Sequence, residues 1–492
     1  MRYISTRALR SDDPSLYCSA SRAIIRGLAE DGGLYVPETI PLLSREELSS
    51  LPALTYEDTA CLILGKYLDF DPHLIRTMVQ EAYSSFDSEG PVAIRPLGSG
   101  PVSVLELWHG PSCAFKDMAL QLLPRLLTAS LQHEDIQDLI WILTATSGDT
   151  GKAALEGFKD VPGTRITVFY PHQGVSAVQE AQMVRQQGTN VDVVAIKGNF
   201  DDAQSAVKRL FSDTCLAERL AQKHILLSSA NSINWGRLLP QIVYYVYTAV
   251  RLGTPEQPVD FSVPTGNFGD ILAGYYAKAM GAPVGRLICA SNANNVLTDF
   301  LTTGTYDRNR PFYKTSSPSM DILVSSNLER LLYLASGGDG PLICSLMKQL
   351  SDRGRYTVPP ELLHRIRQDF SAGYTDDDVT SGTIRYVSET FGYLCDPHTA
   401  VAAHIAFEDV KQQELAGQVP APMVILSTAS PFKFPETVLK AAGLQEAEGF
   451  DALDKVSGNY QLPIPAGLAS LRDLSRRFDK VMEPSELDSL FL

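Results

Sequence analysis

Lys116 is the residue of this sequence best placed for covalent chemistry. It comes after an apolar, strand-like run at residues 102–108 and stands at the start of an apolar helical pattern over residues 118–127. The partial positive charge of a helix N-terminus and a desolvating apolar environment both lower the pKa of an ammonium group. The pattern therefore predicts a neutral, nucleophilic amine, which a Schiff base with an aldehyde cofactor requires. The alternative is a lysine that reaches into solvent from a helix start.

Two loops that contain glycine could each hold an anion. Residues 144–151, the first glycine loop, lie between an expected strand and an expected helix, and residues 264–270, the second glycine loop, repeat this arrangement. The free N–H groups at the start of a helix attract a carboxylate or a phosphate. Two such loops predict either a ligand with two anionic ends or a cofactor together with a substrate. Neither loop has the pattern of a nucleotide site, so nucleotide cofactors are disfavoured.

Two further segments could contact the same ligands. Asn234 and Arg237 are three residues apart and share one face of a helix expected over residues 233–250. A guanidinium beside an amide could clamp a phosphate, although asparagine and serine near a helix start are also common capping residues. Thr428 follows an expected strand, at the edge where open α/β sheets bind ligands.

The composition limits the kind of protein. The 492 residues are 44% hydrophobic and carry a formal net charge of −15, which is typical of a globular protein and argues against nucleic acid as a partner. No apolar run approaches the roughly 20 residues of a membrane span. The seven cysteines and eight histidines lack the spacing of a disulfide framework or a metal site. We therefore expect a cytoplasmic protein with no metal and no membrane partner.

The order of the expected elements indicates the fold. Strands are expected at residues 140–145, 165–170, 191–196, 261–263, 286–290 and 423–426. Short β-branched runs separated by amphipathic helices predict an α/β protein with parallel sheets. The expected parts are a mixed N-terminal domain (1–95), a core (96–445) and a C-terminal tail (446–492). The core would contain a smaller α/β subdomain at roughly residues 135–230 and a helical insertion at roughly 305–395.

Taken together, these segments resemble the threonine synthase family of pyridoxal-phosphate enzymes, within the tryptophan-synthase-β fold group. The resemblance extends from Tyr3-Ile4-Ser5-Thr6-Arg7 to the Thr428 segment and includes Asp396-Pro397-His398. The lysine segment, both glycine loops and residues 229–234 match in order and spacing. The resemblance implies fold type II, with two open parallel-sheet subdomains that carry helices on both faces, plus the small N-terminal domain.

The resemblance also implies a role for each candidate residue. Lys116 would carry the cofactor as a Schiff base and then move protons at Cα and Cβ of the substrate. The cofactor, pyridoxal 5'-phosphate, would also contact Asp149, Gly266, Asn267, Phe268, Gly269, Asp270 and Thr428. The substrate would be bound by Ser147, Gly148 and Thr150 at its carboxylate and by Asn234 and Arg237 at its phosphate. The Thr428 hydroxyl would bind the pyridine nitrogen without protonating it.

The family reaction converts O-phospho-L-homoserine and water into L-threonine and inorganic phosphate, the last step of threonine biosynthesis. One alternative is a threonine-synthase-like phospho-lyase that releases phosphate, ammonia and 2-oxobutyrate. Others are a fold relative such as an amino-acid dehydratase and a catalytically silent binding protein. Ser430 and Phe432 stand where the family commonly has histidine and a small residue, close to the expected cofactor ring. The expected partner is a small-molecule substrate, and the expected oligomeric state is a monomer or a homodimer.

Overall fold

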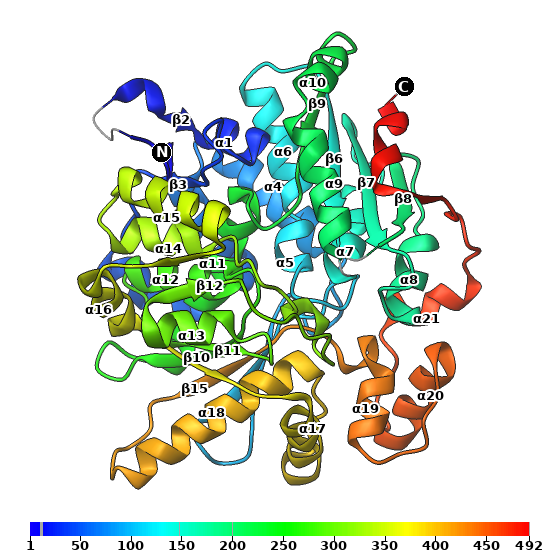
Figure 1. Ribbon diagram of the computed structural model, residues 1–492. Helices are drawn as coiled ribbons and strands as arrows, with labels where there is room; N and C mark the ends of the chain where they lie inside the picture. The colour runs from blue at the N-terminus through cyan, green and yellow to red at the C-terminus, as the bar shows by residue number, and fades with distance from the viewer. Residues whose placement is uncertain (10–12, 147, 199, 492) are drawn as a thin grey trace.

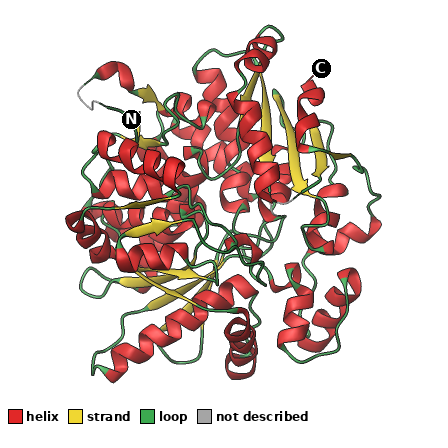
Figure 2. Ribbon diagram, in the orientation of Figure 1, coloured by secondary structure: helices red, strands yellow, loops and turns green. Residues whose placement is uncertain are grey.

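The computed structural model describes residues 1–9, 13–146, 148–198 and 200–491. Ser147, an expected contact of the substrate carboxylate, lies outside the described residues. Figure 1 shows a larger sheet in the lower half of the molecule and a smaller one at the upper right. Helices surround both sheets (Figure 2), so the chain has the layered α/β architecture expected from the sequence.

The larger sheet has the strand order β14-β11-β10-β15-β5-β4. Its strands are β4 (Ala93–Pro96), β5 (Val102–Glu106), β10 (Val259–Pro264), β11 (Val284–Ser291), β14 (Phe370–Tyr374) and β15 (Met423–Ser427). All neighbouring pairs are parallel except β4 with β5. The strands β10 and β15 are buried at every position, because helices cover both faces of the sheet.

Helices on the two faces of the larger sheet come from separate parts of the chain. In Figure 1, α12 (Gly269–Ala279) and α13 (Val296–Thr303) lie on one face and α18 (Pro397–Leu415) lies on the other. The long helix α11 (Trp235–Leu252) packs against α12. The open parallel sheet with helices on both faces confirms the predicted fold class.

The smaller sheet is entirely parallel, with the order β16-β8-β7-β6-β9. Its strands are β6 (Leu139–Ala145), β7 (Thr164–Pro171), β8 (Val191–Ile196), β9 (Ile225–Ser228) and β16 (Val481–Met482). Its helices are α6 (Leu123–His133), α7 (Asp149–Phe158), α8 (Ala177–Val184), α9 (Phe200–Ser212) and α10 (Thr214–Ala221). The strands expected at residues 140–145, 165–170 and 191–196 are therefore confirmed.

The C-terminal tail completes this smaller sheet. Strand β16 pairs with β8 through Val481 and Met482, and Leu487 and Phe491 pack into the same core as Trp141. The helices α20 (Gly449–Tyr460) and α21 (Ala466–Ala469) precede this strand. A two-residue strand is too short to show a hydrophobic period, so the sequence contained no signal for it.

The N-terminal part folds around a small antiparallel sheet of order β2-β1-β3. Its elements are β1 (Arg2–Ser5), β2 (Cys18–Ser19), β3 (Tyr35–Pro37), α1 (Ala20–Arg26), α2 (Arg45–Ser50), α3 (Tyr56–Tyr67) and α4 (Pro72–Tyr83). Helix α1 packs on α6 and helix α3 packs on α11. One continuous apolar core therefore joins this part to the rest of the molecule.

The region 305–395 is mostly helical, as expected, but it also contributes to a sheet. Its helices are α14 (Leu328–Ala335), α15 (Gly340–Arg353), α16 (Pro360–Asp369) and α17 (Asp377–Phe391). Strands β12 (Thr305–Asp307) and β13 (Arg355–Thr357) pair with each other, whereas β14 extends the larger sheet beside β11. The region is thus more than a covering layer, because it supplies an edge strand of the core.

The helix expected over residues 118–127 is divided in two. Helix α5 (Asp117–Leu120) ends after one turn, and α6 begins at Leu123. Pro124 explains the break, because in a continuous helix its ring would clash with the carbonyl of Leu120.

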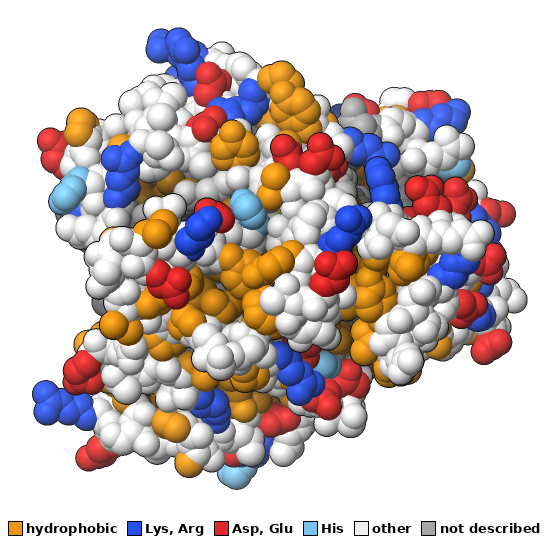
Figure 3. Space-filling model, turned by 90° about the horizontal axis from the view of Figure 1, so that it is seen from below, with side chains coloured by type: hydrophobic (Ala, Val, Ile, Leu, Met, Phe, Trp, Pro, Cys, Tyr) orange, Lys and Arg blue, Asp and Glu red, His pale blue; other side chains and the backbone are white. Residues whose placement is uncertain are grey.

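Among the described residues, no helix combines the length and the apolar character needed to cross a bilayer. On the face drawn in Figure 3, acidic and basic side chains are scattered among hydrophobic and uncharged ones.

We expect Leu487→Ala to lower the free energy of unfolding by about 2–5 kcal/mol, because it leaves a cavity under the smaller sheet. Leu487 is fully buried. Urea denaturation followed by fluorescence would measure the change, since Trp141 lies in the same core. Ser485→Ala, an exposed position in the same tail, serves as the control. If Leu487→Ala unfolds with the same midpoint urea concentration as the wild type, the tail does not stabilise the sheet.

Candidate active site

The residues predicted to form a site converge on one cavity of about 970 Å³. The cavity lies at the carboxyl ends of β6, β10 and β15, where Ala145, Pro264 and Thr428 line it. This is the edge at which open α/β sheets bind ligands, and the volume suits a small molecule with its cofactor. The predicted residues among its lining are Lys116, Asp149, Thr150, Arg237, Gly266, Asn267, Phe268, Gly269, Asp270 and Thr428.

Lys116 lies at the wall of this cavity, directly before α5. Burial lowers the pKa of its ammonium group below the ordinary value, while the nearby Asp149 carboxylate opposes this shift. Its Nζ lies 4.6 Å from the centre of the Phe115 ring. Burial is thus the cause of the lowered pKa, and the single-turn helix α5 is too short for a large helix dipole. The direction of the shift agrees with the predicted chemistry of Lys116.

The loop that carries Lys116 is attached to the end of β15. The Phe115 N–H donates to the Thr428 carbonyl at 2.8 Å, and Ala114 forms an isolated antiparallel bridge with Ala429. Asp117 accepts the Ser112 N–H at 2.7 Å and so closes the loop on itself. These contacts fix Lys116 relative to Thr428, two residues that are far apart in the sequence.

The second glycine loop leads into α12 with its backbone facing the cavity. Phe268, the residue before the helix, has a φ of 61° in the left-handed region. A Cβ on Gly266 would come within 2.8 Å of the Ser319 carbonyl oxygen, so only glycine fits there. The N-terminus of this 11-residue helix therefore opens onto the cavity, where it can bind a phosphate group.

Asp270, in the first turn of α12, is buried with an incomplete set of partners. Its Oδ1 accepts hydrogen bonds from the hydroxyls of Tyr244 at 2.6 Å and Tyr245 at 2.9 Å. Its Oδ2 has no hydrogen-bond partner among the described residues. Burial raises the pKa of the Asp270 carboxyl to about 6, although the two tyrosine hydroxyls lower it.

The first glycine loop offers fewer free donors than expected. The N–H groups of Gly148 and Gly151 both donate to the Thr146 hydroxyl, at 3.0 and 2.8 Å. Gly148 has a φ of 137° and is not among the residues that line the cavity. Thr150 and Asp149 do line it, so these two residues present the loop to a ligand.

Of the two residues expected to bind the substrate phosphate, Asn234 and Arg237, only Arg237 remains a candidate. Asn234 does not line the cavity, because its side chain is committed to the backbone. Its Nδ2 donates to the carbonyls of Ile24 and Ser229, and its Oδ1 accepts the Gly236 N–H. These contacts use both of its N–H donors, which are the groups that a phosphate would need. We therefore treat Asn234 as the cap of α11 and not as a ligand of the phosphate.

Arg237 keeps its place as a candidate ligand of an anion. It lines the cavity, is 3% exposed and donates to the Ala230 carbonyl. Its Nε has no hydrogen-bond partner among the described residues. Burial lowers the pKa of its guanidinium to about 10. A buried cation that lacks a carboxylate partner is well suited to hold an anionic ligand.

The two unusual residues after Thr428 lie elsewhere than expected. Ser430 and Phe432 do not line the cavity. The Ser430 hydroxyl caps a short 3-10 helix, Pro431–Lys433, by accepting the Phe432 N–H. The Phe432 ring packs into the core beside α18 and α19 (Pro435–Ala441). The structure thus does not place either residue on the wall of the cavity, although both were expected close to the cofactor ring, because the turn directs them into the interior.

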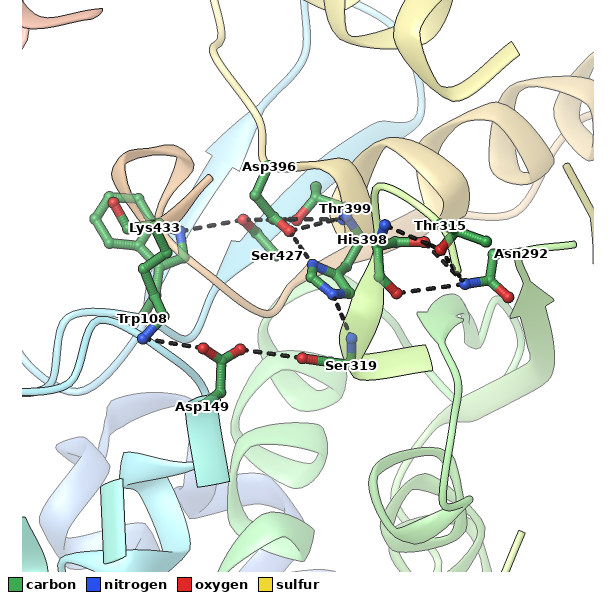
Figure 4. Close-up of polar contacts among 12 residues, drawn as sticks. Trp108, Asp149, Asn292, Thr315, Ser319, Asp396, His398, Thr399, Ser427 and Lys433 are labelled. Carbon is green, nitrogen blue, oxygen red and sulfur yellow. Dashed lines mark hydrogen bonds and ion pairs between the residues drawn. The ribbon is translucent and has the colours of Figure 1, made fainter. Parts of the chain in front are cut away.

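A polar network behind the cavity contains residues to which the sequence assigned no role (Figure 4). Lys433 Nζ forms an ion pair with Asp149 Oδ1 at 3.0 Å. The Ser319 hydroxyl donates to Asp149 Oδ2 at 3.1 Å, and the Ser319 N–H donates to His398 Nε2 at the same distance. Burial raises the pKa of the Asp149 carboxyl, but the Lys433 and Lys116 charges outweigh this and hold it below its ordinary value.

The N-terminal part supplies one wall of the cavity, which the sequence did not indicate. Arg26, Leu28, Ala29 and Gly32 line it, and Lys208 of α9 lines the same cavity. Their types are ordinary for a helix end and a turn, so only the three-dimensional packing identifies them. Residues from distant parts of the chain thus meet around one cavity.

The observed residues fit a cofactor that has both an aldehyde and a phosphate. Lys116 provides an amine of lowered pKa, and the N-terminus of α12 provides backbone N–H groups for the phosphate. Thr428 also lines the cavity, and its hydroxyl is a group that can bind a ring nitrogen. The fold and this site define a pyridoxal-phosphate-dependent enzyme of the parallel-sheet type. Residues 94–429 match the family model described as "Pyridoxal-phosphate dependent enzyme".

The remainder of the chain gives the family. Residues 2–83 match the model "Threonine synthase N terminus", and residues 399–489 match "Threonine synthase, C-terminal". The chain belongs to the threonine synthase family. The threonine synthase of Pseudomonas aeruginosa is 41% identical over 457 residues, which cover 92% of each chain.

Two further relatives bear on the comparison. The crystal structure of PLP-bound threonine synthase from Brucella melitensis aligns with a TM-score of 0.87 and 38% identity, covering 100% of this chain and 98% of that one. The human protein named threonine synthase-like 1 is 40% identical over 464 residues, which cover 90% of this chain and 61% of the human protein. The whole fold is therefore shared with a threonine synthase.

The buried Asp270 carboxyl makes stability depend on pH. Its pKa is about 6 in the folded protein, against an ordinary value of 3.8. The folded state therefore retains a proton that the unfolded state has lost, and wild-type stability falls as the pH rises between these values. In Asp270→Asn this titration is absent. The free energy of unfolding of Asp270→Asn, measured relative to that of the wild type at the same pH, should therefore increase by about 3 kcal/mol between about pH 4 and about pH 8.

Urea denaturation of the cofactor-free protein at several pH values would measure this difference. Asp378→Asn is a matched control, since Asp378 is in the first turn of α17 but exposed. A difference between Asp270→Asn and wild type that stays constant with pH would show that Asp270 does not retain the proton.

Proposed function

We propose that this protein converts O-phospho-L-homoserine and water into L-threonine and inorganic phosphate, with pyridoxal 5'-phosphate held at Lys116. The observation that carries the proposal is the placement in one cavity of Lys116 and of the Arg237 guanidinium, whose Nε has no hydrogen-bond partner among the described residues. The first provides an amine for a cofactor aldehyde, and the second provides a cation for a phosphate that leaves the substrate. Membership of the threonine synthase family supports the same reaction.

When bound, pyridoxal phosphate withdraws electrons from the substrate and so makes its Cα and Cβ protons acidic. Lys116 Nζ holds the cofactor aldehyde and, once released, moves protons at these two carbons. The backbone N–H groups of Gly269 and its neighbours bind the cofactor phosphate. The Thr428 hydroxyl binds the pyridine nitrogen, and as a neutral group it leaves that nitrogen unprotonated.

The substrate contacts follow from the remaining lining residues. Thr150 binds the substrate carboxylate, and Arg237 binds its phosphate and stabilises the negative charge that grows as the phosphate leaves. Asp149 contacts the cofactor near its ring oxygen. Each carboxylate oxygen can accept more than one hydrogen bond, so the contacts of Asp149 with Lys433 and Ser319 leave capacity for this one.

The proposal includes the compartment and partners predicted from the sequence, namely a cytoplasmic monomer or homodimer that acts on a small molecule. The alternative reaction is phosphate elimination to 2-oxobutyrate and ammonia, which would use the same cavity. The human relative named threonine synthase-like 1 is as similar in identity as the bacterial threonine synthase. The products therefore have to be measured.

Incubation of the cofactor-loaded enzyme with O-phospho-L-homoserine should release threonine and phosphate in equal amounts. Lys116→Ala should lose this activity and, after dialysis, the visible absorbance of the bound cofactor, because no amine remains to hold the aldehyde. Lys440→Ala, an exposed lysine, is the control. Phosphate released together with 2-oxobutyrate would contradict the proposed reaction, and a visible band retained by Lys116→Ala would contradict the role of Lys116.

Arg237→Met should raise KM for O-phospho-L-homoserine by about 10- to 100-fold, because one charge-assisted contact with the phosphate is lost. Steady-state kinetics would give this ratio, and Arg237→Lys should recover only part of it, since lysine cannot bind in a bidentate manner. Arg251→Lys, near the other end of α11, is the control. An unchanged KM in Arg237→Met would place the substrate phosphate elsewhere.

A further inference from the structure

Ser319 is the point at which three separate parts of the chain meet beside the cavity. It belongs to the short 3-10 helix Pro318–Met320, within residues 315–322, which we call the wall loop. Its hydroxyl donates to Asp149 Oδ2 at 3.1 Å, and its N–H donates to His398 Nε2 at 3.1 Å. Figure 4 shows Ser319 between these two side chains. One residue of the wall loop is therefore fastened to α7 and to α18 at once.

The protonation state of His398 follows from these contacts. Because a backbone N–H can only donate, Nε2 of His398 must accept, and the ring proton lies on Nδ1. Nδ1 lies 2.7 Å from Asp396 Oδ1, so Asp396 fixes this tautomer. The His398 ring is also packed against Phe434, with 4.9 Å between the ring centres. His398 is thus a rigid, neutral acceptor for the wall loop.

Asp149 has hydrogen-bond partners on both of its carboxylate oxygens, Oδ1 as well as the Oδ2 that accepts from Ser319. Its Oδ1 receives Lys433 Nζ at 3.0 Å and Gln179 Nε2 at 3.0 Å. Lys433 is fully buried and Asp149 is 3% exposed, so little water competes for these contacts. The Ser319 hydroxyl therefore donates to a carboxylate whose position is already fixed. This hydrogen bond holds the wall loop in place.

The rest of the wall loop is shaped so that Ser319 faces the cavity. Asp321 accepts hydrogen bonds from Asn292 at 2.8 Å and from the Thr315 hydroxyl at 2.7 Å, which closes the loop on itself. The Ser319 carbonyl lies against Gly266 of the second glycine loop, and Ser319 itself lines the cavity. A shift of Ser319 would move the wall that faces the proposed cofactor phosphate.

We propose that Ser319 is a positioning residue, which His398 holds by its backbone and which fastens the wall loop to Asp149. In this arrangement the wall loop keeps the second glycine loop in its binding conformation. It also keeps Asp149, at the start of α7, close to Lys116. The kinetic part of the test rests on the proposed function, whereas hydrogen exchange and cofactor affinity do not.

Three variants separate the two contacts of Ser319. Ser319→Ala removes the donor to Asp149 and keeps the N–H that binds His398. His398→Asn keeps a donor for Asp396 near the position of Nδ1 but lacks an acceptor for the wall loop, whereas His398→Gln places an acceptor near the position of Nε2. Ser316→Ala is the matched control, because the Ser316 hydroxyl makes an equivalent bond of 2.8 Å to Asp377 on the exposed side of the same loop.

The rate of amide hydrogen exchange in a peptide that covers the wall loop, measured in the cofactor-loaded enzyme, shows directly how firmly the loop is held. We expect exchange about 10-fold faster in Ser319→Ala and His398→Asn, with a cofactor dissociation constant raised about 10-fold, as the loss of one hydrogen bond to a charged or buried partner implies. KM for O-phospho-L-homoserine should rise more than kcat falls. Ser316→Ala should stay close to the wild type in all three measurements, and His398→Gln should show smaller effects than His398→Asn because it restores the acceptor for the wall loop.

The double variant Ser319→Ala/His398→Asn gives the decisive comparison. If both residues act by holding the wall loop in one position, the cofactor dissociation constant of the double variant should match that of the more strongly affected single variant. It should not equal the wild-type value multiplied by the fold-changes of both single variants. Multiplied effects, wild-type exchange in Ser319→Ala, or equal effects of His398→Asn and His398→Gln would each overturn the proposal. A failure of the proposed reaction would appear only in the kinetics, so the two failures are distinguishable.

Discussion

The buried ion pair between Lys433 and Asp149 holds the two sheets in their relative positions. Lys433 Nζ also donates to the Ser112 carbonyl at 2.9 Å and to Gln182 Oε1 at 2.8 Å. It therefore connects the loop of Lys116 with α7 and α8 of the smaller sheet. Removal of one partner from a buried pair leaves an unpaired charge and costs about 3–5 kcal/mol. The positions of the reactive amine and of the first glycine loop both depend on this one cation.

A second buried cation links the N-terminal part to the same site. Arg330 is fully buried and donates to the carbonyls of Tyr35 at 3.0 Å and Ile233 at 2.6 Å, and also to Asn327. Asn327 in turn donates to the Asn267 carbonyl in the second glycine loop. The helix α14 that carries Arg330 thus joins three regions that the sequence presents as separate. The N-terminal part belongs structurally to the site that it borders.

The sequence contained the local features of this protein but not the contacts between distant segments. Lys116, both glycine loops and the main strands could be predicted, because each depends on spacing within a few residues. Asn234 was misassigned, since its partner Ile24 lies in another part of the chain and only the packing reveals that its amide is used. The short strand β16 and the edge strand β14 carry no clear period.

The same reasoning explains the misplacement of Ser430 and Phe432. A sequence position next to Thr428 suggests a place next to the ligand, yet a single 3-10 turn was enough to direct Phe432 into the core. Lys433, the next residue, forms an ion pair with Asp149. A residue's distance from the site along the chain is therefore a poor guide to its distance in space, particularly after the end of a strand.

The pairing of β16 with β8 has a consequence for the order in which the protein is completed. Strands β6, β7, β8 and β9 leave the ribosome well before β16 and the apolar residues Leu487 and Phe491, which follow every strand of the larger sheet in the chain. Until then, β8 is an open sheet edge and Trp141 lacks part of its covering. The smaller sheet is therefore begun before most of the larger sheet is made but completed only after it, so the nascent chain carries an unfinished sheet while the larger sheet is synthesised.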